Sequence, residues 1–378
     1  MKDEKQTRNR SIDFIRGISI ILIIIYHVYA ISLQFGYGPH IRIPVFSEIL
    51  TFGGEIGVTL FFIMSGYGIY FSLDKEYERA GIINIKRYIR KRWIRIAPQY
   101  YISLAVVLFL TEGAVYLGRG GIKSVFTHCL FIHNFWPDTH GSISGVLWTM
   151  GVIVQFYLVS IFLYKCMKKA PVVSVLCAIL ITIIAKYIIF HVVGTEQYFV
   201  YGRQLITSLD NFMWGMFLAG CDRKQWVIQK KRILPLSMFI IIVGVFSLFV
   251  VYSARRTIYA DSIIGYVWHS VLALLLTGII FWLSRIRICF ESKIFYPFMV
   301  ISENEYGIYI WHLLIINAVL SKSSFANWLA SKSFFAECLF FVVVTVIAGY
   351  IATKLIDKTL SQMLSPDKTT ETQEVGSA

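Results

Sequence analysis

Residues 11–33 read SIDFIRGISIILIIIYHVYAISL, and this nearly unbroken apolar run constrains the fold more than any other feature of the chain. A segment of about 20 apolar residues is long enough to cross the hydrocarbon core of a bilayer as an α-helix. Further apolar segments of similar length follow along the sequence. The pattern therefore predicts an all-α, polytopic membrane protein with about ten transmembrane helices. We expect them at residues 11–33, 54–73, 98–117, 144–164, 171–192, 203–221, 233–252, 263–284, 303–320 and 334–355.

Composition supports this class and leaves little room for a separate soluble domain. The chain has 378 residues, of which 57% are hydrophobic and 15% charged, and its mean hydropathy is +0.65. Such values are typical of polytopic membrane proteins. We expect a cytoplasmic N-terminal segment at residues 1–10, a multi-pass membrane domain at 11–355, and a polar, disordered cytoplasmic tail at 356–378.

The positive charges indicate an orientation. The net charge is +14, and most of the 36 Lys and Arg residues fall in segments on the same side of the membrane as residues 1–10. Positively charged loops face the cytoplasm, so both termini and residues 74–97 should be cytoplasmic, in a multi-pass protein of the cell membrane. Because no basic domain has interleaved aromatic residues, we expect the lipid bilayer, and no nucleic acid, as a partner.

Arg16 and His27 are the unexpected residues in the first apolar run. Eleven helical residues at about 100° each return to within about 20° of the starting direction, so both side chains share one face, about 16 Å apart in depth. Arg16 could reach the headgroups, and His27 could be a packed helix residue. Ionisable groups within a membrane helix are nevertheless functional candidates by default, and the two in register favour function.

The segment KRYIRKRWIR at residues 86–95 is the most basic part of the chain, and it includes Arg90, Arg92 and Arg95. Its charge could serve only orientation and attraction to anionic lipid. Its density also suits a phosphate-binding platform for a nucleotide-bearing donor, because Arg binds phosphate through paired hydrogen bonds.

Other polar residues in apolar runs are weaker candidates. Trp148, Gln155 and His312 could contact substrate or could pack within the protein. No metal site is predicted, because His128, His133 and His140 match no helix-borne ligand spacing. The six cysteines are scattered, so no disulfide framework is indicated.

Several motifs together resemble the acyltransferase 3 family, whose members are membrane proteins that acylate sugars of surface and exported glycans. IDFIRGISIILIIIYHV resembles its first helix, with Asp13 before Arg16 and ten residues between Arg16 and His27. Later motifs of the family resemble four further segments, GVTLFFIMSGYGI, RKRWIRIAPQYY, LWTMGVIVQFYL and FMWGMFLAG. A late Tyr-x-x-Tyr-x-x-His pattern of the family is matched by EYGIYIWHLLI, in which it begins at Tyr306. The likeness covers about residues 10–355 in order.

Two positions depart from the family pattern. Ile153 and Val154 stand where the fourth-helix motif usually has one or two glutamates before Gln-Phe-Tyr, and Glu305 stands where the late motif often has Ser. A carboxylate role on the fourth helix therefore does not carry over to this chain.

The resemblance implies an integral-membrane O-acyltransferase that moves an acyl group from acyl-CoA to a sugar hydroxyl of a surface or exported glycan. Acetyl is the acyl group that we expect. Acyl-CoA would be a co-substrate, with no tightly bound cofactor, and the acceptor would be a glycan or lipid-linked sugar. His27 would act as the general base, Arg16 would guide the donor, and Arg90, Arg92 and Arg95 would hold its nucleotide end.

Two rival functions remain open from the sequence. A carrier or flippase for a glycolipid or anionic solute would use Arg16 as a counter-ion and His27 as a proton-coupling group. A catalytically inactive relative would bind glycan intermediates without transferring an acyl group, and the missing glutamates favour this alternative.

Overall fold

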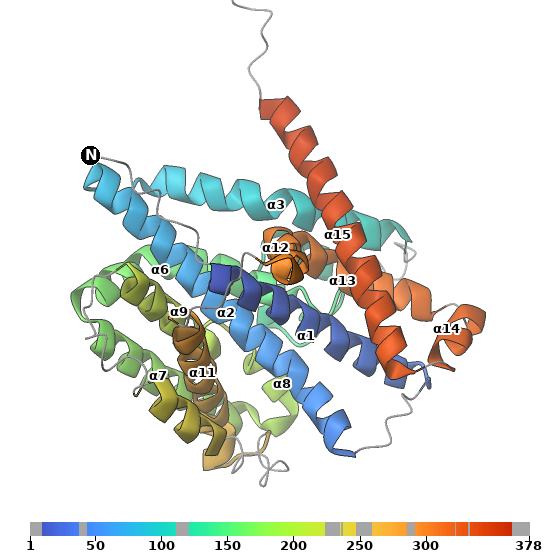
Figure 1. Ribbon diagram of the computed structural model, residues 1–378, viewed down its shortest axis with the longest axis horizontal. Helices are drawn as coiled ribbons and strands as arrows, with labels where there is room; N and C mark the ends of the chain where they lie inside the picture. The colour runs from blue at the N-terminus through green and yellow to red at the C-terminus, as the bar shows by residue number, and fades with distance from the viewer. Residues whose placement is uncertain are drawn as a thin grey trace, which may run out of the picture.

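A computed structural model describes residues 10–37, 44–110, 121–223, 235, 237–246, 259–285, 292–321, 323–331 and 333–364. All regular elements in these ranges are helical (Figure 1). The α-helices are α1 (Arg10–Gln34), α2 (Pro44–Ala80), α3 (Ile85–Leu110), α5 (Gly121–Cys129), α6 (Trp148–Lys169), α7 (Pro171–Ile188), α8 (Tyr198–Tyr201), α9 (Leu209–Asp222), α11 (Ile263–Leu283), α12 (Tyr296–Glu303), α13 (Glu305–Leu320), α14 (Ser323–Ala330) and α15 (Phe334–Leu364). The predicted all-α membrane class is confirmed.

Seven of the described helices are long and apolar enough to cross a membrane. They are α1, α2 from Phe52, α3, α6, α7 with its π-helical continuation to Val193, α11, and α15 to Thr359. The predicted sixth, seventh and ninth spans coincide with shorter described helices: α9 has 14 residues, Ser237–Phe246 is a short apolar helix, and α13 has 16 residues. These fall short of the about 20 residues that a full crossing needs, so ten full-length spans stay a prediction.

Helix α1 lies in the middle of the bundle, where it packs on α2, α12, α13 and α15 (Figure 1). Close approach of α1 to α12 depends on Gly17, where an added Cβ would lie 2.8 Å from the backbone oxygen of Phe298. The most extensive helix contact joins α2 to α9. There a Cβ on Gly66 would clash with the backbone of Phe212, and one on Gly215 with that of Ile63. Lipid tails are as apolar as the side chains of the helices, so helix association in a membrane depends on close packing, which these small residues allow.

The start of the third span was predicted wrongly, and its predicted end at residue 117 lies outside the described residues. Helix α3 begins at Ile85, not at residue 98, and Pro98 lies inside it. Tyr88, Arg92 and Ile96 are buried at intervals of four residues, which is a helical stripe that the surrounding charges conceal in the sequence. The hydroxyl of Tyr88 lies 2.7 Å from Ser160 Oγ on α6, which ties this first half of α3 to the bundle.

Helix α15 also extends past its predicted limit. It continues to Leu364, so residues 356–364, which we expected to belong to a disordered tail, are helical. The remainder of that predicted tail, like the predicted N-terminal segment before Arg10, lies outside the described residues.

Candidate active site

The two membrane histidines of the sequence analysis meet at the centre of the molecule. His27 on α1 and His312 on α13 have ring centroids 4.9 Å apart, and His312 Nε2 lies 3.3 Å from His27 Nδ1. His312 is fully buried, and His27 is partly buried. Seven residues earlier on α13, Glu305 contacts Arg16 of α1. Arg16 and His27 therefore face the same neighbouring helix, as their spacing predicted.

Backbone carbonyls assign a consistent proton arrangement to this pair. His27 Nδ1 lies 2.8 Å from the oxygen of Ile23, and His312 Nδ1 lies 2.6 Å from that of Tyr309. A carbonyl oxygen only accepts hydrogen bonds, so each neutral ring carries its proton on Nδ1. His27 Nδ1–H is then shared between two acceptors, the Ile23 oxygen at 2.8 Å and the unprotonated His312 Nε2 at 3.3 Å. The lone pair of His27 remains on Nε2, which is the atom able to take up a proton.

Tyr309 and Thr149 extend this cluster, and neither was singled out as a site residue from the sequence. The Tyr309 hydroxyl lies 2.7 Å from Thr149 Oγ1 and donates to the carbonyl of Val146 at 2.8 Å. Its ring stacks on Phe61 of α2, with centroids 5.4 Å apart. Tyr306, Tyr309 and His312 recur every third residue, and that spacing was the available signal for Tyr309.

A cavity of about 70 Å³, which we call the arginine cavity, lies on the Arg16 side of the histidine pair. Its lining includes Arg16, Arg92, Arg95, Tyr157, Glu305 and Tyr306. Glu305 Oε1 lies 3.8 Å from Arg16 Nη1 and 3.7 Å from Arg95 Nη2. The carboxylate thus bridges a helix α1 arginine and a helix α3 arginine at the cavity.

The arginines of this cavity retain unused donors. Arg92 is only 7% exposed, and its Nε and Nη2 have no hydrogen-bond partner among the described residues. Its guanidinium lies over the rings of Tyr88 and Tyr157, at 5.4 and 5.6 Å from their centroids. Arg16 Nε is likewise buried without a partner, while its Nη2 donates to the carbonyl of Met64 at 3.3 Å. Buried unpaired donors are costly and mark a place for an acceptor-bearing ligand.

Two sequence details acquire meaning in this cavity. Ile153 lines it from α6, so the side chain that replaces the usual glutamate faces the same space as Glu305. The carboxylate usual at this position of α6 is thus absent, while Glu305 of α13 places a carboxylate in the lining of the same cavity. Gly68 leaves room for Arg16, because an added Cβ would lie 2.9 Å from Arg16 Nη2.

Other predicted site residues lie elsewhere. Arg90 is exposed and does not line the arginine cavity, so it is separated from Arg92 and Arg95. Asp13 is buried and accepts a hydrogen bond of 3.4 Å from Ser302 Oγ of α12. Gln155 donates to Asn134 Oδ1 at 3.1 Å in a network that ties α6 to the preceding loop. This contact favours the packing interpretation for Gln155.

A second and larger cavity, of about 380 Å³, lies towards the opposite end of the bundle, and we call it the aromatic cavity. Its aromatic lining residues are Tyr26, Phe62, Trp148, Tyr198, Phe199 and Tyr259. Glu55, Arg203, Asn211 and His269 are among its polar lining residues. Tyr26, Phe62 and Trp148 belong to segments that the sequence already marks as motifs, whereas Tyr198, Phe199 and Tyr259 do not, because the lining comes from segments far apart in the chain.

The order of lining residues along three helices shows how the cavities are arranged. On α1, Arg16 lines the arginine cavity and Tyr26 the aromatic one. On α2, residues between Glu55 and Phe62 line the aromatic cavity, and residues between Phe61 and Ile69 line the arginine cavity. On α6, Trp148 lines the aromatic cavity, and residues between Met150 and Tyr157 line the arginine cavity. The cavities therefore succeed each other along the bundle.

His27 lines neither cavity, but it lies next to Tyr26, which lines the aromatic cavity. Its ring lies 5.0 Å from that of Tyr26, and through His312 and Tyr309 it contacts the ring of Phe61. A group placed here can act on a reaction between molecules that enter from opposite ends.

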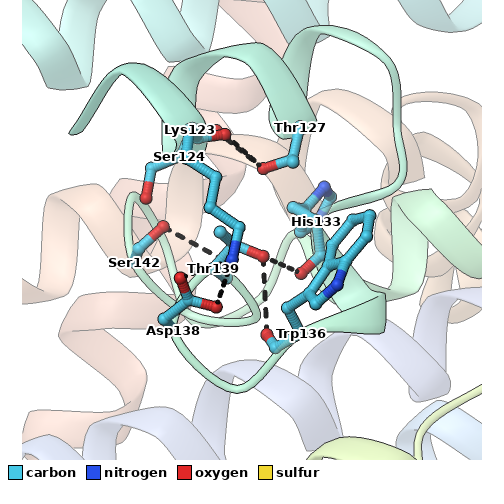
Figure 2. Close-up of polar contacts among 8 residues, drawn as sticks. All are labelled: Lys123, Ser124, Thr127, His133, Trp136, Asp138, Thr139 and Ser142. Carbon is cyan, nitrogen blue, oxygen red and sulfur yellow. Dashed lines mark hydrogen bonds and ion pairs between the residues drawn. The ribbon is translucent and has the colours of Figure 1, made fainter. Parts of the chain in front are cut away.

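His128, near the end of α5, and His133, in the loop that follows, form a separate pair whose rings stack with centroids 3.9 Å apart, and His140 is buried farther along the loop. Figure 2 shows His133 together with the ion pair between Lys123 Nζ of α5 and Asp138 Oδ2 of the loop, which are 2.7 Å apart. Burial lowers the pKa of His128 to about 4 and that of His133 to about 2. Within the described residues no group of three or more His, Cys, Asp or Glu side chains is arranged to hold a metal ion.

Comparison with protein families gives one match that covers most of the chain. A family model described as an acyltransferase domain, that of acyltransferase 3, matches residues 9–354. No solved structure matches the chain significantly.

Relatives with the same kind of name occur in two bacteria. O-acetyltransferase OatA of Staphylococcus aureus is 26% identical over 330 residues, which cover 81% of this chain and 50% of the relative. Peptidoglycan O-acetyltransferase OatA of Listeria monocytogenes is 27% identical over 342 residues, which cover 81% of this chain and 49% of the relative. The chain thus spans about half the length of these curated relatives.

Proposed function

The chain belongs to the acyltransferase 3 family, and we propose that it is an integral-membrane O-acyltransferase that transfers an acetyl group from acetyl-CoA to a sugar hydroxyl. The observation that carries this proposal is the contact between His27 and His312, with backbone carbonyls that assign the proton of each ring to Nδ1 and so leave His27 Nε2 as the basic atom. The names of the relatives supply the acetyl group and the glycan class.

In the proposed reaction His27 Nε2 removes the proton of the acceptor hydroxyl while the oxygen attacks the thioester carbonyl. The carbon–sulfur bond of the tetrahedral intermediate then breaks, and the proton passes from the imidazolium to the CoA thiolate. A positioned general base contributes about 10²–10⁴ in rate. His312 positions His27 by accepting from Nδ1–H, which is the arrangement that keeps the base atom directed away from its neighbour.

The donor would enter at the arginine cavity. By the positive-inside rule, this end of the bundle faces the cytoplasm, where acyl-CoA is found. A cavity of about 70 Å³ admits only the thin thioester end of the donor, so the nucleotide would lie outside it, beside the basic surface of α3. Arg92 and Arg16 supply unused donors for phosphate or pantetheine oxygens, and Glu305 holds Arg16 and Arg95 in place until these arrive.

Transfer from radiolabelled acetyl-CoA by the purified protein tests this function. Label should pass to a glycan acceptor or to water with the wild type, and His27→Ala and His27→Gln should each lower the rate by at least a hundredfold. His191→Ala is the matched control, because His191 also places Nδ1 near the carbonyl four residues earlier, at 3.1 Å, and is exposed. Label that stays on CoA with the wild type would favour a carrier or an inactive relative instead.

A further inference from the structure

Three residues that line the aromatic cavity carry buried polar atoms that the described part of the protein does not satisfy. Asn211 Oδ1, Tyr198 Oη and His269 Nδ1 are buried without a hydrogen-bond partner among the described residues. Asn211 is 5% exposed and Tyr198 is 6% exposed. A lining that buries both acceptors and donors without partners is costly unless a polar ligand completes their hydrogen bonds.

Arg203 is held in the same lining in an unusual way. Its guanidinium lies 3.8 Å from the ring centroid of Phe199 and 5.1 Å from that of Trp148. Within the described residues, its guanidinium has no hydrogen-bond acceptor and no ion-pair partner. Contact with two ring faces restricts the plane of the guanidinium and leaves its N–H edge for a carboxylate or phosphate, which such a planar fork binds in two contacts.

A fixed carboxylate lies among these groups. Glu55 Oε2 is 3.3 Å from His269 Nε2, and the hydroxyl of Tyr259 donates to Glu55 Oε1 at 3.3 Å. Because each carboxylate oxygen accepts more than one hydrogen bond, Glu55 can still accept from a ligand hydroxyl. The cavity thus combines aromatic faces, an acceptor of hydroxyl protons and a cation.

From these contacts we propose that the aromatic cavity binds an acidic sugar, whose anionic group pairs with Arg203 and whose hydroxyls contact Glu55 and Asn211. The volume of about 380 Å³ falls within the about 300–1,000 Å³ of small-molecule sites, which combine apolar and aromatic walls with a few placed polar groups. The aromatic rings would face the apolar sides of the sugar, while its hydroxyls meet the polar residues.

This assignment rests on the proposed function in one respect, which is that the bound sugar is the acyl acceptor. Tyr26 belongs to the cavity lining and is the chain neighbour of His27, with ring centroids 5.0 Å apart. Arg203 is also close enough to interact electrostatically with both side chains. A sugar held on Arg203 would therefore present a hydroxyl near His27 from the end opposite to the donor.

Binding of two tetrasaccharides to the full chain in lipid nanodiscs tests the proposal without requiring turnover. One is a chitotetraose, which is neutral. The other is the alternating N-acetylglucosamine and N-acetylmuramic acid tetrasaccharide, which differs by its lactyl carboxylates. The wild type should bind the acidic tetrasaccharide at least tenfold more tightly, as expected for a hydrogen bond to a charged group. Arg203→Met should remove this difference, and Asn211→Leu should weaken the binding of both.

Lys123→Met is the control, because it removes a positive charge that is paired with Asp138 outside the cavity, and it should preserve the tenfold preference. Equal affinities for the two sugars in the wild type, unchanged binding by Arg203→Met, or no binding of either sugar would overturn the proposal. Consumption of labelled acetyl-CoA is measured on the same samples. A wild type that binds the acidic sugar but never consumes donor would retain the sugar site and reject the acyltransferase.

Discussion

At the scale of single residues, solvent exposure separates side chains that look alike in the sequence. Arg90, Arg92 and Arg95 belong to one basic run, yet Arg92 is 7% exposed, the Arg95 side chain is 55% exposed, and Arg90 points away from the arginine cavity. Charge contacts in water are screened by salt, whereas buried ones are screened much less. These three arginines should therefore affect donor use differently.

We expect Arg92→Ala and Arg95→Ala to raise the donor KM about tenfold to a hundredfold with little change in kcat, because a phosphate contact contributes about 1.5–3 kcal/mol to both ground and transition states. Raised salt should weaken donor use by Arg92→Ala, which retains the solvated Arg95, more than by Arg95→Ala. Steady-state kinetics at two salt concentrations measures both effects. Arg90→Ala should change KM less than twofold. If the wild type and the three variants had similar KM values for the donor, the basic run would serve only to orient the protein in the membrane.

At the scale of elements, the end of α5 and the loop that follows it bury two histidines. His128 and His133 are fully buried, and burial lowers the pKa of each well below its usual value of 6.5. The unfolded chain therefore binds protons below about pH 6.5 that the folded loop does not. Stability that depends on these histidines is present above that pH and declines as the pH falls towards 4.

We expect the unfolding temperature to fall as the pH is lowered from 7 to 5, and a His128→Phe/His133→Leu variant should lose less over the same interval. Thermal unfolding monitored by intrinsic fluorescence at each pH gives this comparison. The exposed His191→Leu serves as a control that should not lessen the loss, because His191 Nδ1 lies 3.4 Å from Asp261 Oδ1 and its protonation favours the folded state. Parallel curves for the wild type and the double variant would show that these two histidines do not set the pH dependence.

At the scale of the whole molecule, the contacts agree with the alternating directions expected of successive membrane spans. Arg16 meets Glu305 and, further along both helices, His27 meets His312, so α1 and α13 run in the same direction. The first and ninth of ten alternating spans must do so. Helices α2 and α6 both run from the aromatic to the arginine cavity, as the second and fourth spans must.

We therefore expect a membrane-impermeant maleimide, added to intact cells, to label Lys123→Cys and not Lys91→Cys. Both side chains are exposed, and the positive-inside rule puts them on opposite sides of the membrane. The exposed native cysteines, Cys129 and Cys177, are first replaced by serine. Labelling of Lys91→Cys in sealed cells would reverse the orientation and, with it, the side from which the donor enters. Permeabilised cells provide the positive control for both sites.

Much of the fold could be predicted from the sequence, because the bilayer imposes a length on every apolar crossing and the helix imposes a period on every face. The common face of Arg16 and His27 followed from that period alone. The start of α3 was missed because its apolar stripe at Tyr88, Ile96 and the buried Arg92 is interrupted by solvated charges. A hydropathy pattern averages over such a segment, whereas burial distinguishes its two faces.

The long apolar helices and the side chains that share one helix face could be predicted from the sequence, since both depend on local geometry. Tertiary packing sets the contacts between helices: Glu305 bridges Arg16 and Arg95, and His312 rather than a carboxylate contacts His27. It also brings Arg203 and Glu55 into the lining of one cavity. These contacts depend on how the helices cross one another. The crossing is set by close packing at positions such as Gly66 and Gly215, and the periodicity of a single helix does not predict it.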